Sequence, residues 1–284
     1  MGQSLSRIAE DLVRAAKANS LVWRGMTLTT SFQPIYSVKE AGCTGFEALV
    51  RAQDEAGNAI RPERLFARSF EEGDGVLLDW ICRALHLRKF ATLDPGDRIL
   101  FVNVNPEAAV KDAKSTREFA DLVRFYGLTP DRVCIEILED SCSDEGLLRE
   151  AVSGYRALGA QIAMDDFGIG RSNFDRIVAL RPDVVKIDRS VLTDAVGDLK
   201  ARRMLPAIIE LLHEAGAKVA IEGIESASEA LLAMDSGADL LQGFHFAAPS
   251  ATLPDDPLTK RILGELLRMR GAQQKPVNAL VGAH

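Results

Sequence analysis

The chain has 284 residues, a formal net charge of −7, 47% hydrophobic residues and 26% charged residues. This composition is typical of a folded protein with a substantial core, and it excludes a mostly disordered chain. The negative charge gives no electrostatic reason to expect duplex nucleic acid as a partner. No apolar run approaches the roughly 20 residues of a membrane-spanning helix. Without a recognisable signal peptide, and with four cysteines that lack metal-binding spacing, we expect a cytoplasmic protein with reduced thiols.

The N-terminal third of the chain predicts one helix, two strands and a second helical stretch. Residues 4–18 carry apolar side chains at helical spacing, and this helix is expected on the outside of the domain. From Thr27 the sequence is rich in β-branched residues, as is typical of a strand, and residues 43–53 predict another strand. Residues 62–90 again have helical periodicity.

After Pro95 the sequence alternates between short apolar runs and helical segments. The runs predict strands and the segments predict helices, one of which contains Pro206 and should kink or break there. Successive strand–helix units favour parallel strands, because the chain must cross back before it can form the next strand. The predicted strands in this part lie at residues 98–105, 133–139, 161–167, 184–188, 218–224 and 240–244.

About eight strands in a chain near the roughly 250 residues of an α/β barrel predict one TIM-like (β/α)8 barrel of the α/β class. No linker or change in composition divides the chain, so we expect a single domain with extra terminal helices. The barrel should occupy residues 25–272. An N-terminal helix lies within residues 1–24, and a C-terminal tail covers residues 273–284.

Two adjacent carboxylates, Asp165 and Asp166, end a short apolar run, and Gly168 and Gly170 follow them. Alternate residues of a strand face opposite sides, so both carboxylates can reach one site only if the strand ends there. Glycine permits such an ending. Two neighbouring carboxylates repel each other unless a cation lies between them. An isolated pair of this kind is more often a helix cap beside a solvated turn.

The pair is not isolated, because nearly every predicted strand ends in a polar or acidic residue that its apolar run does not require. The carboxyl ends of all strands in an α/β barrel gather on one face, which is the active-site face. One lysine cannot neutralise five or more carboxylates there, and no histidine or cysteine accompanies them, which favours hard divalent cations. Such sites commonly catalyse displacement at phosphorus. The residues are Glu47, Asn103, Glu136, Glu139, Asp165, Asp166, Lys186, Asp188, Glu222, Glu225 and Gln242.

Eight short motifs resemble those of the EAL domain, the bacterial cyclic-di-GMP phosphodiesterase. They fall in family order and at plausible spacing between about Phe32 and Pro249, and eight motifs in register are very unlikely to arise by chance. The resemblance implies hydrolysis of cyclic-di-GMP to linear pGpG in bacterial second-messenger signalling. The motifs are FQPI, GFEALVR, VNVNP, IEILED, MDDFGIG, VVKIDRS, AIEGIE and LLQGF.

The resemblance also implies which residues hold metal ions. It assigns a first ion to Glu47, Asn103, Glu136 and Asp165. A second ion would be held by Asp166 and shared with Asp165. The expected cofactor is two Mg²⁺ or Mn²⁺ ions, and Ca²⁺ is expected to inhibit.

Further roles are implied for residues around these ions. Lys186 would position the attacking water, and Glu222 would orient or deprotonate it. Glu139 and Glu225 would support the site from behind, Glu139 by holding the loop after Phe167 in its working shape. The residues expected to contact the dinucleotide are Gln33, Arg51, Asp188 and Gln242.

The loop after Phe167 departs from the usual family pattern. Family members usually have a small residue or Thr at the position of Ile169, an aromatic residue near Arg171 and Ser at Asn173. A Thr is also common where Leu138 stands. In the family this loop is tied to dimerisation and to placement of the second metal ion, so a homodimer through it is expected.

Two other functions remain open from the sequence. The chain could be a catalytically weak receptor that holds cyclic-di-GMP without cutting it, although such receptors generally lack several acidic ligands that are all present here. It could also be a scaffold whose amphipathic helices at residues 4–18 and 258–270 dock a partner, although surface helices of any barrel look the same. The complete set of acidic residues favours an enzyme.

Overall fold

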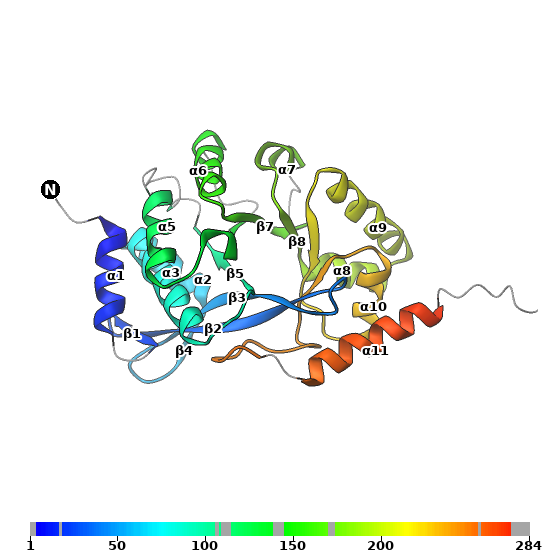
Figure 1. Cartoon of the computed structure of the whole chain (residues 1–284), viewed down its shortest axis with the longest axis horizontal. Helices are drawn as coiled ribbons and strands as arrows, with labels where there is room; N and C mark the ends of the chain where they lie inside the picture. Colours follow the sequence, from blue (N-terminus) through cyan, green and yellow to red (C-terminus); the bar gives the residue numbers. More distant parts are fainter. Residues whose placement is uncertain are drawn as a thin grey trace, which may run out of the picture.

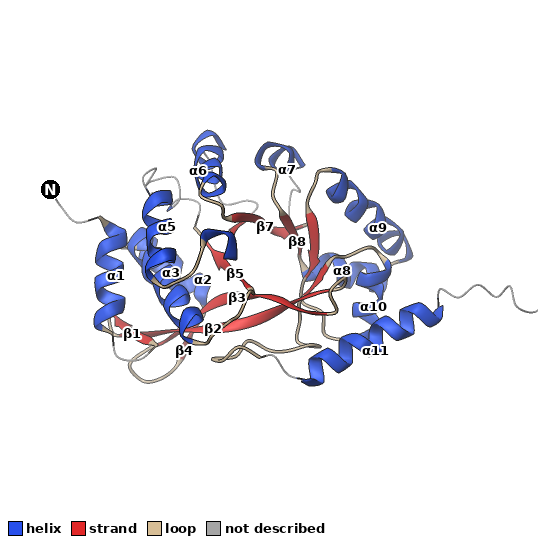
Figure 2. Cartoon of the chain, in the orientation of Figure 1, coloured by secondary structure: helices blue, strands red, loops and turns tan. Residues whose placement is uncertain are grey.

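The computed structural model describes residues 4–16, 19–105, 108, 115–138, 145–169, 174–254 and 257–273. Eight strands in these ranges close into a barrel that is surrounded by helices (Figure 1; Figure 2 colours the same view by secondary structure). They are β2 (Met26–Ser37), β3 (Gly42–Gln53), β5 (Ile99–Asn103), β6 (Val133–Leu138), β7 (Gln161–Phe167), β8 (Val184–Ile187), β9 (Lys218–Ile221) and β10 (Leu240–Leu241). Their order is β2, β10, β9, β8, β7, β6, β5, β3, and pairing of β2 with β3 closes the circle. The predicted single TIM-like barrel is confirmed.

The direction of β2 differs from the prediction of parallel strands. β2 pairs antiparallel with both β3 and β10, whereas the remaining neighbours in the barrel are parallel. Only residues 38–41 link β2 to β3. So short a link can join an antiparallel hairpin, but it cannot cross back to start a parallel strand. The hairpin register places Gln33 directly opposite Glu47.

Ten α-helices lie within the described ranges. The predicted helical stretch at residues 62–90 consists of two helices, because Gly73, at φ +83°, ends the first of them. Of the kink or break expected at Pro206, the break is absent, since α9 continues through this residue. The helices are α1 (Leu5–Ala15), α2 (Pro62–Glu71), α3 (Gly75–Thr92), α5 (Ser115–Phe125), α6 (Glu145–Ala157), α7 (Phe174–Leu180), α8 (Arg189–Gly197), α9 (Leu199–Glu214), α10 (Ala227–Asp235) and α11 (Pro257–Gln273).

Short elements that the sequence did not predict complete the described fold. β1 (Ser20–Trp23) extends the sheet beside β2, and β4 (Ala59–Ile60) pairs with β3. A single 3₁₀ turn, Pro130–Arg132, precedes β6. None of the described helices is both long enough and apolar enough to cross a membrane.

A cluster of buried apolar side chains lies inside the barrel. Seven strands each contribute one residue to this buried cluster, and the eighth, β3, contributes Gly45 at the same level. A Cβ atom on Gly45 would lie 2.9 Å from the ring of Phe101, so the glycine leaves room for that ring. The members are Ile35, Phe101, Cys134, Ala163, Val184, Ala220 and Leu240. This cluster is the floor on which the polar residues of the mouth rest.

A buried ion pair within α3 connects the helix to its surroundings. Arg83 and Asp79 are both buried and paired with each other. The Asp79 carboxylate also accepts a hydrogen bond from the backbone N–H of Asn105 at 3.0 Å, just beyond β5. On the other side, Arg83 donates to the hydroxyl of Tyr155 in α6 at 3.1 Å. The pair therefore links α3 to the backbone just beyond β5 and to helix α6.

We expect Asp79→Ala to lower the free energy of unfolding by about 3–5 kcal/mol, because it leaves the Arg83 charge buried and uncompensated. Urea denaturation checks this value. Asp121→Ala, which breaks the exposed Arg124–Asp121 pair of α5, is the matched control and should change stability little. Equal effects of the two substitutions would contradict a structural role for the buried pair.

Candidate active site

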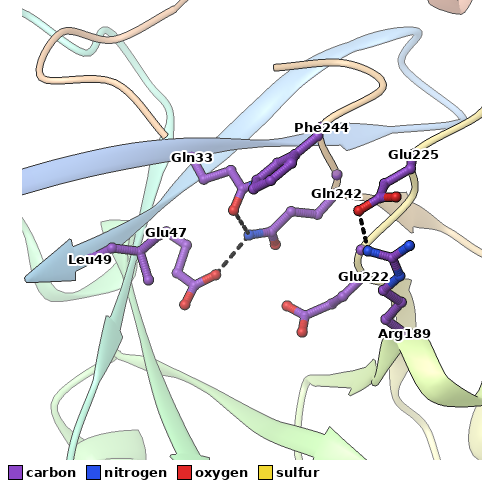
Figure 3. A pocket seen from close by; sticks show the side chains of 10 residues that line it. Gln33, Glu47, Leu49, Arg189, Glu222, Glu225, Gln242 and Phe244 are labelled. Atoms are coloured by element: carbon purple, nitrogen blue, oxygen red, sulfur yellow. Dashed lines mark hydrogen bonds and ion pairs between the residues drawn. The ribbon is translucent and has the colours of Figure 1, made fainter. Parts of the chain in front are cut away.

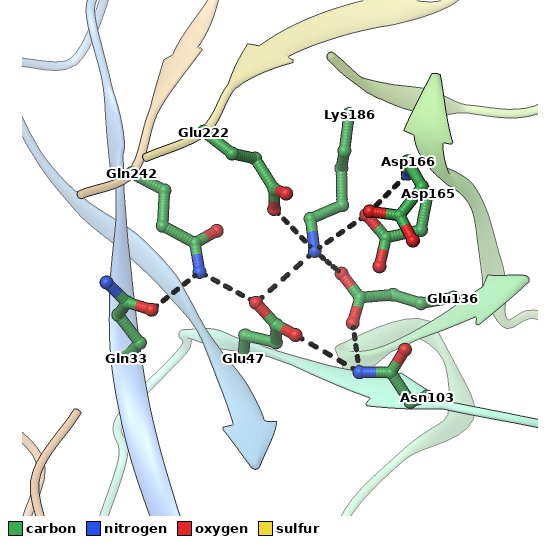
Figure 4. Close-up of polar contacts among 9 residues, drawn as sticks. All are labelled: Gln33, Glu47, Asn103, Glu136, Asp165, Asp166, Lys186, Glu222 and Gln242. Carbon is green, nitrogen blue, oxygen red and sulfur yellow. Dashed lines mark hydrogen bonds and ion pairs between the residues drawn. The ribbon is translucent and has the colours of Figure 1, made fainter. Parts of the chain in front are cut away.

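Polar side chains of all eight barrel strands, or of the residue just after a strand, meet on one level (Figure 4). Each polar residue lies two positions after the buried residue of its strand. Because side chains two residues apart in a strand face the same side, both point into the barrel. In β2, which runs antiparallel, Gln33 instead precedes its buried residue, Ile35, by two positions. The residues are Gln33, Glu47, Asn103, Glu136, Asp165, Lys186, Glu222 and Gln242. All eight were singled out from the sequence.

The ammonium group of Lys186 lies at the centre of this level, and its side chain is only 1% exposed. Its Nζ atom is 2.6 Å from Glu136 Oε1, 2.7 Å from Glu222 Oε1, and 3.3 Å from both Glu47 Oε2 and Asp165 Oδ1. Burial alone would lower the pKa of Lys186, but the surrounding carboxylates outweigh it and raise the pKa well above its usual value. In the absence of metal, Lys186 is therefore held in its charged form, which does not suit the role of a base.

Two side-chain amides orient the carboxylates around Lys186. Asn103 Nδ2 donates to Glu47 Oε1 and to Glu136 Oε2, both at 3.1 Å. Gln242 Nε2 donates to Glu47 Oε2 at 2.7 Å and to Gln33 Oε1 at 3.3 Å. Glu47 is therefore held from two sides by amides, and Gln33 belongs to the same chain of hydrogen bonds.

The two adjacent aspartates reach the site in a different way from the one expected. β7 does not end at Asp165 but continues to Phe167. Asp166 adopts φ +59°, and the pairing of β7 with β8 shifts register between Met164 and Phe167. This irregularity, rather than the following glycines, turns the second carboxylate toward the first, since Asp tolerates the left-handed conformation better than most residues.

The carboxylates carry more charge than one ammonium can balance. Burial raises the pKa of Glu136 well above its usual value, although Lys186 opposes this effect. Burial, together with the charges of Asp165 and Asp188, raises the pKa of Asp166 to about 6. Burial also raises the pKa of Glu222 to about 8, again against Lys186. A divalent cation would relieve this imbalance.

The positions of the carboxylates fit two such cations. One ligand atom each from Glu47, Glu136 and Asp165 lies within 4.8 Å of the others, and the same holds for Asp165, Asp166 and Glu222. The two groups share Asp165, as expected for a bridging ligand. All donors are oxygen atoms, which suits hard cations such as Mg²⁺, Mn²⁺ and Ca²⁺.

Two cavities adjoin the polar level. One, of about 180 Å³, is bounded by Glu47, Glu222 and Gln242 together with Arg189, Glu225 and the exposed ring of Phe244 (Figure 3). The other, of about 460 Å³, opens beside Asn103 and Asp166 and has a mainly apolar lining. The apolar members of that lining include Ala48, Leu49, Val50, Phe66 and Val104.

Arg189 and Phe244 were not predicted as site residues. Arg189 is the first residue of α8, so no strand-end pattern points to it, and its place in the motif VVKIDRS was the available sequence signal. Phe244 closes the motif LLQGF, and an aromatic residue there was the available sequence signal. Glu225 pairs with Arg189 at the rim, and its backbone N–H donates to the Glu229 carboxylate at 2.7 Å.

The remaining predicted residues lie farther from the centre or outside the described ranges. Arg51 Nη1 donates to the carbonyl oxygen of Val50 at 3.0 Å, and it is not among the residues that line either cavity. Asp188 caps α8 by accepting from the N–H of Ser190 at 2.8 Å. It directly follows the carboxyl end of β8. Three predicted positions, Glu139, Arg171 and Asn173, lie outside the described residues.

Residues 14–249 match the sequence profile of the EAL domain, and the chain belongs to this family. YkuI of Bacillus subtilis is 30% identical over 240 residues, covering 82% of this chain and 58% of that protein. The solved structure of YkuI, in complex with substrate c-di-GMP and calcium, aligns with a TM-score of 0.77 and 25% identity over 87% of this chain and 62% of that chain.

Two further relatives carry names that bear on function. PdeB of Escherichia coli, named a probable cyclic di-GMP phosphodiesterase, is 26% identical over 222 residues, covering 76% of this chain and 41% of that protein. A manganese and cyclic-di-GMP complex of Klebsiella pneumoniae BlrP1 aligns with a TM-score of 0.71 and 25% identity over 78% of this chain and 56% of that chain. The chain thus spans less than two thirds of each of these proteins.

The raised pKa of Glu222 predicts how stability depends on pH in the absence of metal. In the folded protein this carboxyl loses its proton near pH 8, but in the unfolded chain near 4.5. The folded state therefore binds the extra proton between these values, and stability falls as pH rises through this window. The pKa of His86 is lowered to about 3, so titration of His86 makes stability rise with pH. This rise is complete by about pH 7, above the pKa of histidine in the unfolded chain.

We therefore expect the free energy of unfolding to fall between about pH 7 and 8.5, measured by urea denaturation without metal. The free energy of unfolding of the Glu222→Gln variant should fall clearly less over the same range, because this side chain has no carboxyl group to titrate. Saturating Mn²⁺ should flatten the wild-type curve. Parallel curves for wild type and variant would show that Glu222 does not carry the raised pKa.

Proposed function

We propose that the chain hydrolyses cyclic-di-GMP to linear pGpG and uses two divalent ions, Mg²⁺ or Mn²⁺. The observation that carries this proposal is the convergence of four carboxylates within 3.3 Å of the Lys186 ammonium at the barrel mouth. The names of PdeB and of the ligand-bound YkuI and BlrP1 structures support the choice of substrate. A ligand with two bases and two phosphates also suits a charged centre beside two cavities.

The metal ions would be held by the shared set of oxygen donors. Glu47, Asn103, Glu136 and Asp165 would bind the first ion, and Asp166 would join Asp165 on the second. When bound, such ions lower the pKa of water and balance the charge that develops on phosphorus. Ca²⁺ is expected to occupy the same donors without supporting turnover, because it accepts more ligands in a looser geometry than Mg²⁺.

Lys186 and Glu222 would carry out the proton and phosphate chemistry. The fixed positive charge of Lys186 would hold the attacking water and a phosphate oxygen. Glu222, 2.7 Å from Lys186, has a pKa of about 8 without metal, and nearby cations would move it toward the operating pH. A group with such a pKa suits the transfer of a proton from the water. The water would attack phosphorus in line with the departing 3′ oxygen, and that P–O bond would break, with the 3′ oxygen taking up a proton from solvent to leave as a hydroxyl.

The substrate would be positioned by residues around the two cavities. Gln33 and Gln242 line the smaller cavity, where the exposed ring of Phe244, at 64%, offers a face for base stacking. Arg51 would use its planar fork of donors on a phosphate or a guanine edge. Asp188 would contact the dinucleotide from the start of α8. Glu139 stays a predicted supporting residue.

The decisive experiment is product analysis after incubation with cyclic-di-GMP. We expect pGpG with Mg²⁺ or Mn²⁺ and intact ligand with Ca²⁺. Binding without cleavage under every metal would instead support a receptor. No binding at all would support a scaffold. In either case the proposed hydrolysis would be wrong.

Variants test the assigned roles in the same assay. Asp165→Asn should abolish hydrolysis without unfolding the protein, because it removes the charge of the shared ligand and keeps its shape. Glu222→Gln and Lys186→Met should keep substrate affinity and lower turnover by roughly 10²–10⁴-fold, the usual contribution of a positioned acid–base group. If these two variants lose binding while the bound fraction turns over normally, the residues only clamp the substrate.

A homodimer through the loop after Phe167 is part of the proposal. Exposed apolar side chains flank residues 170–173 on both sides, namely Ile169 before them and Phe174 and Val178 in α7. Val178→Glu should therefore give a monomer in sedimentation equilibrium, while the wild type sediments as a dimer. A wild-type monomer at high protein concentration, with full activity, would contradict this interface. A cytoplasmic location and the absence of duplex nucleic acid as a partner stay predictions, as do the domain limits.

A further inference from the structure

The ion pair between Arg189 and Glu225 lies at the rim of the smaller cavity (Figure 3). Both side chains are nearly half exposed, at 46% and 44%. Among the described residues that line this cavity, Arg189 is the only one with a positive charge, and three carboxylates accompany it. An ion pair this exposed contributes little to stability. The Arg189–Glu225 pair lines the same cavity as Glu222, so we ask what it does for that residue.

The stem of Arg189 packs directly against the backbone that follows Glu222. A Cβ atom on Gly223 would lie 2.5 Å from Cβ, 2.7 Å from Cγ and 2.8 Å from Cδ of Arg189. Gly223 also has φ +64°, a conformation that favours glycine. The chain thus turns sharply under the Arg189 stem, immediately after the residue proposed to accept the proton.

The segment from Glu222 to Glu225 lies outside any strand, so its backbone is held by separate bonds. The N–H of Glu222 donates to Ile187 at 3.1 Å, and the N–H of Ile224 donates to Gln242 at 3.1 Å. The N–H of Glu225 donates to Glu229 at 2.7 Å. Arg189 reaches across this turn, with its stem on Gly223 and its guanidinium on Glu225.

We propose that Arg189, bridging to Glu225, is a positioning residue that holds Glu222 against Lys186; this rests on the proposed function only for its kinetic consequence. The stem blocks outward movement of Gly223, and the ion pair keeps the stem in place. Glu222 then stays directed into the cavity, where its carboxylate lies 2.7 Å from Lys186 Nζ.

Crystal structures of the metal-free wild type and Arg189→Ala test the placement without any reference to activity. We expect the Glu222–Lys186 separation to open beyond about 3.5 Å, the limit of a hydrogen bond, in the variant. Arg189→Lys, which keeps most of the stem and the charge, should retain the short distance. Arg124→Ala in the exposed pair of α5 is the control and should leave the distance unchanged. An unchanged distance in Arg189→Ala overturns the proposal.

Kinetics give the second readout. Arg189→Ala and Glu225→Gln should each lower kcat about 10–100-fold, as is usual for residues that support a site from behind, with KM unaltered. The double variant should lower kcat no more than either single variant does. In a Glu222→Gln background, Arg189→Ala should not lower kcat further. A raised KM with normal kcat would show that Arg189 contacts the substrate instead, and would overturn the proposal. A wild type without hydrolysis would refute the proposed function, while the crystallographic distance would still decide the placement.

Discussion

The buried ammonium of Lys186 is the interaction on which the rest of the site depends. Taking an isolated charge out of water costs several kcal/mol even after the protein relaxes, so Lys186 and its carboxylates are tolerable only together. The carboxylates still outnumber it, which is why burial can keep the pKa of Glu136 and Glu222 high. Negative charge at the barrel mouth therefore exceeds the positive charge of Lys186. This excess, rather than any single ligand, favours the binding of divalent cations there.

The geometry of the barrel explains how distant residues come to share one level. Strand side chains repeat every two residues, so a polar residue two positions beyond a buried apolar one must face the same interior. Cys134 and Glu136 illustrate this in β6, and Val184 and Lys186 in β8. The rule holds even where the chain runs the other way, since Gln33 precedes its floor residue, Ile35.

The sequence was sufficient to predict the parts of the fold in which side chains follow the two-residue period of a strand. It placed the strands from residue 98 onward and seven residues of the central level, because each of the seven lies at or near the end of an apolar run. Gln33 was implied only by the resemblance to the EAL domain. It did not give the direction of β2, although the short link at residues 38–41 could have done so. The left-handed conformation of Asp166 leaves no trace in the hydrophobic pattern. The Arg189–Glu225 pair joins residues far apart in the chain, and only the folded barrel brings them together.

The two halves of the site differ in how firmly the fold holds them. Glu136, Asp165 and Lys186 lie within strands that have a partner strand on both sides, although the pairing of β7 with β8 shifts register beside Asp165. Glu222 and Gln242 lie just beyond the ends of β9 and β10, where separate backbone bonds and neighbouring side chains hold them. Metal ligands need fixed positions, because coordination distances tolerate little change. A group that must accept a proton and release it again gains from limited freedom. In the proposed mechanism, the strands would fix the metal ligands, and the turn held by Arg189 would carry the group that transfers the proton.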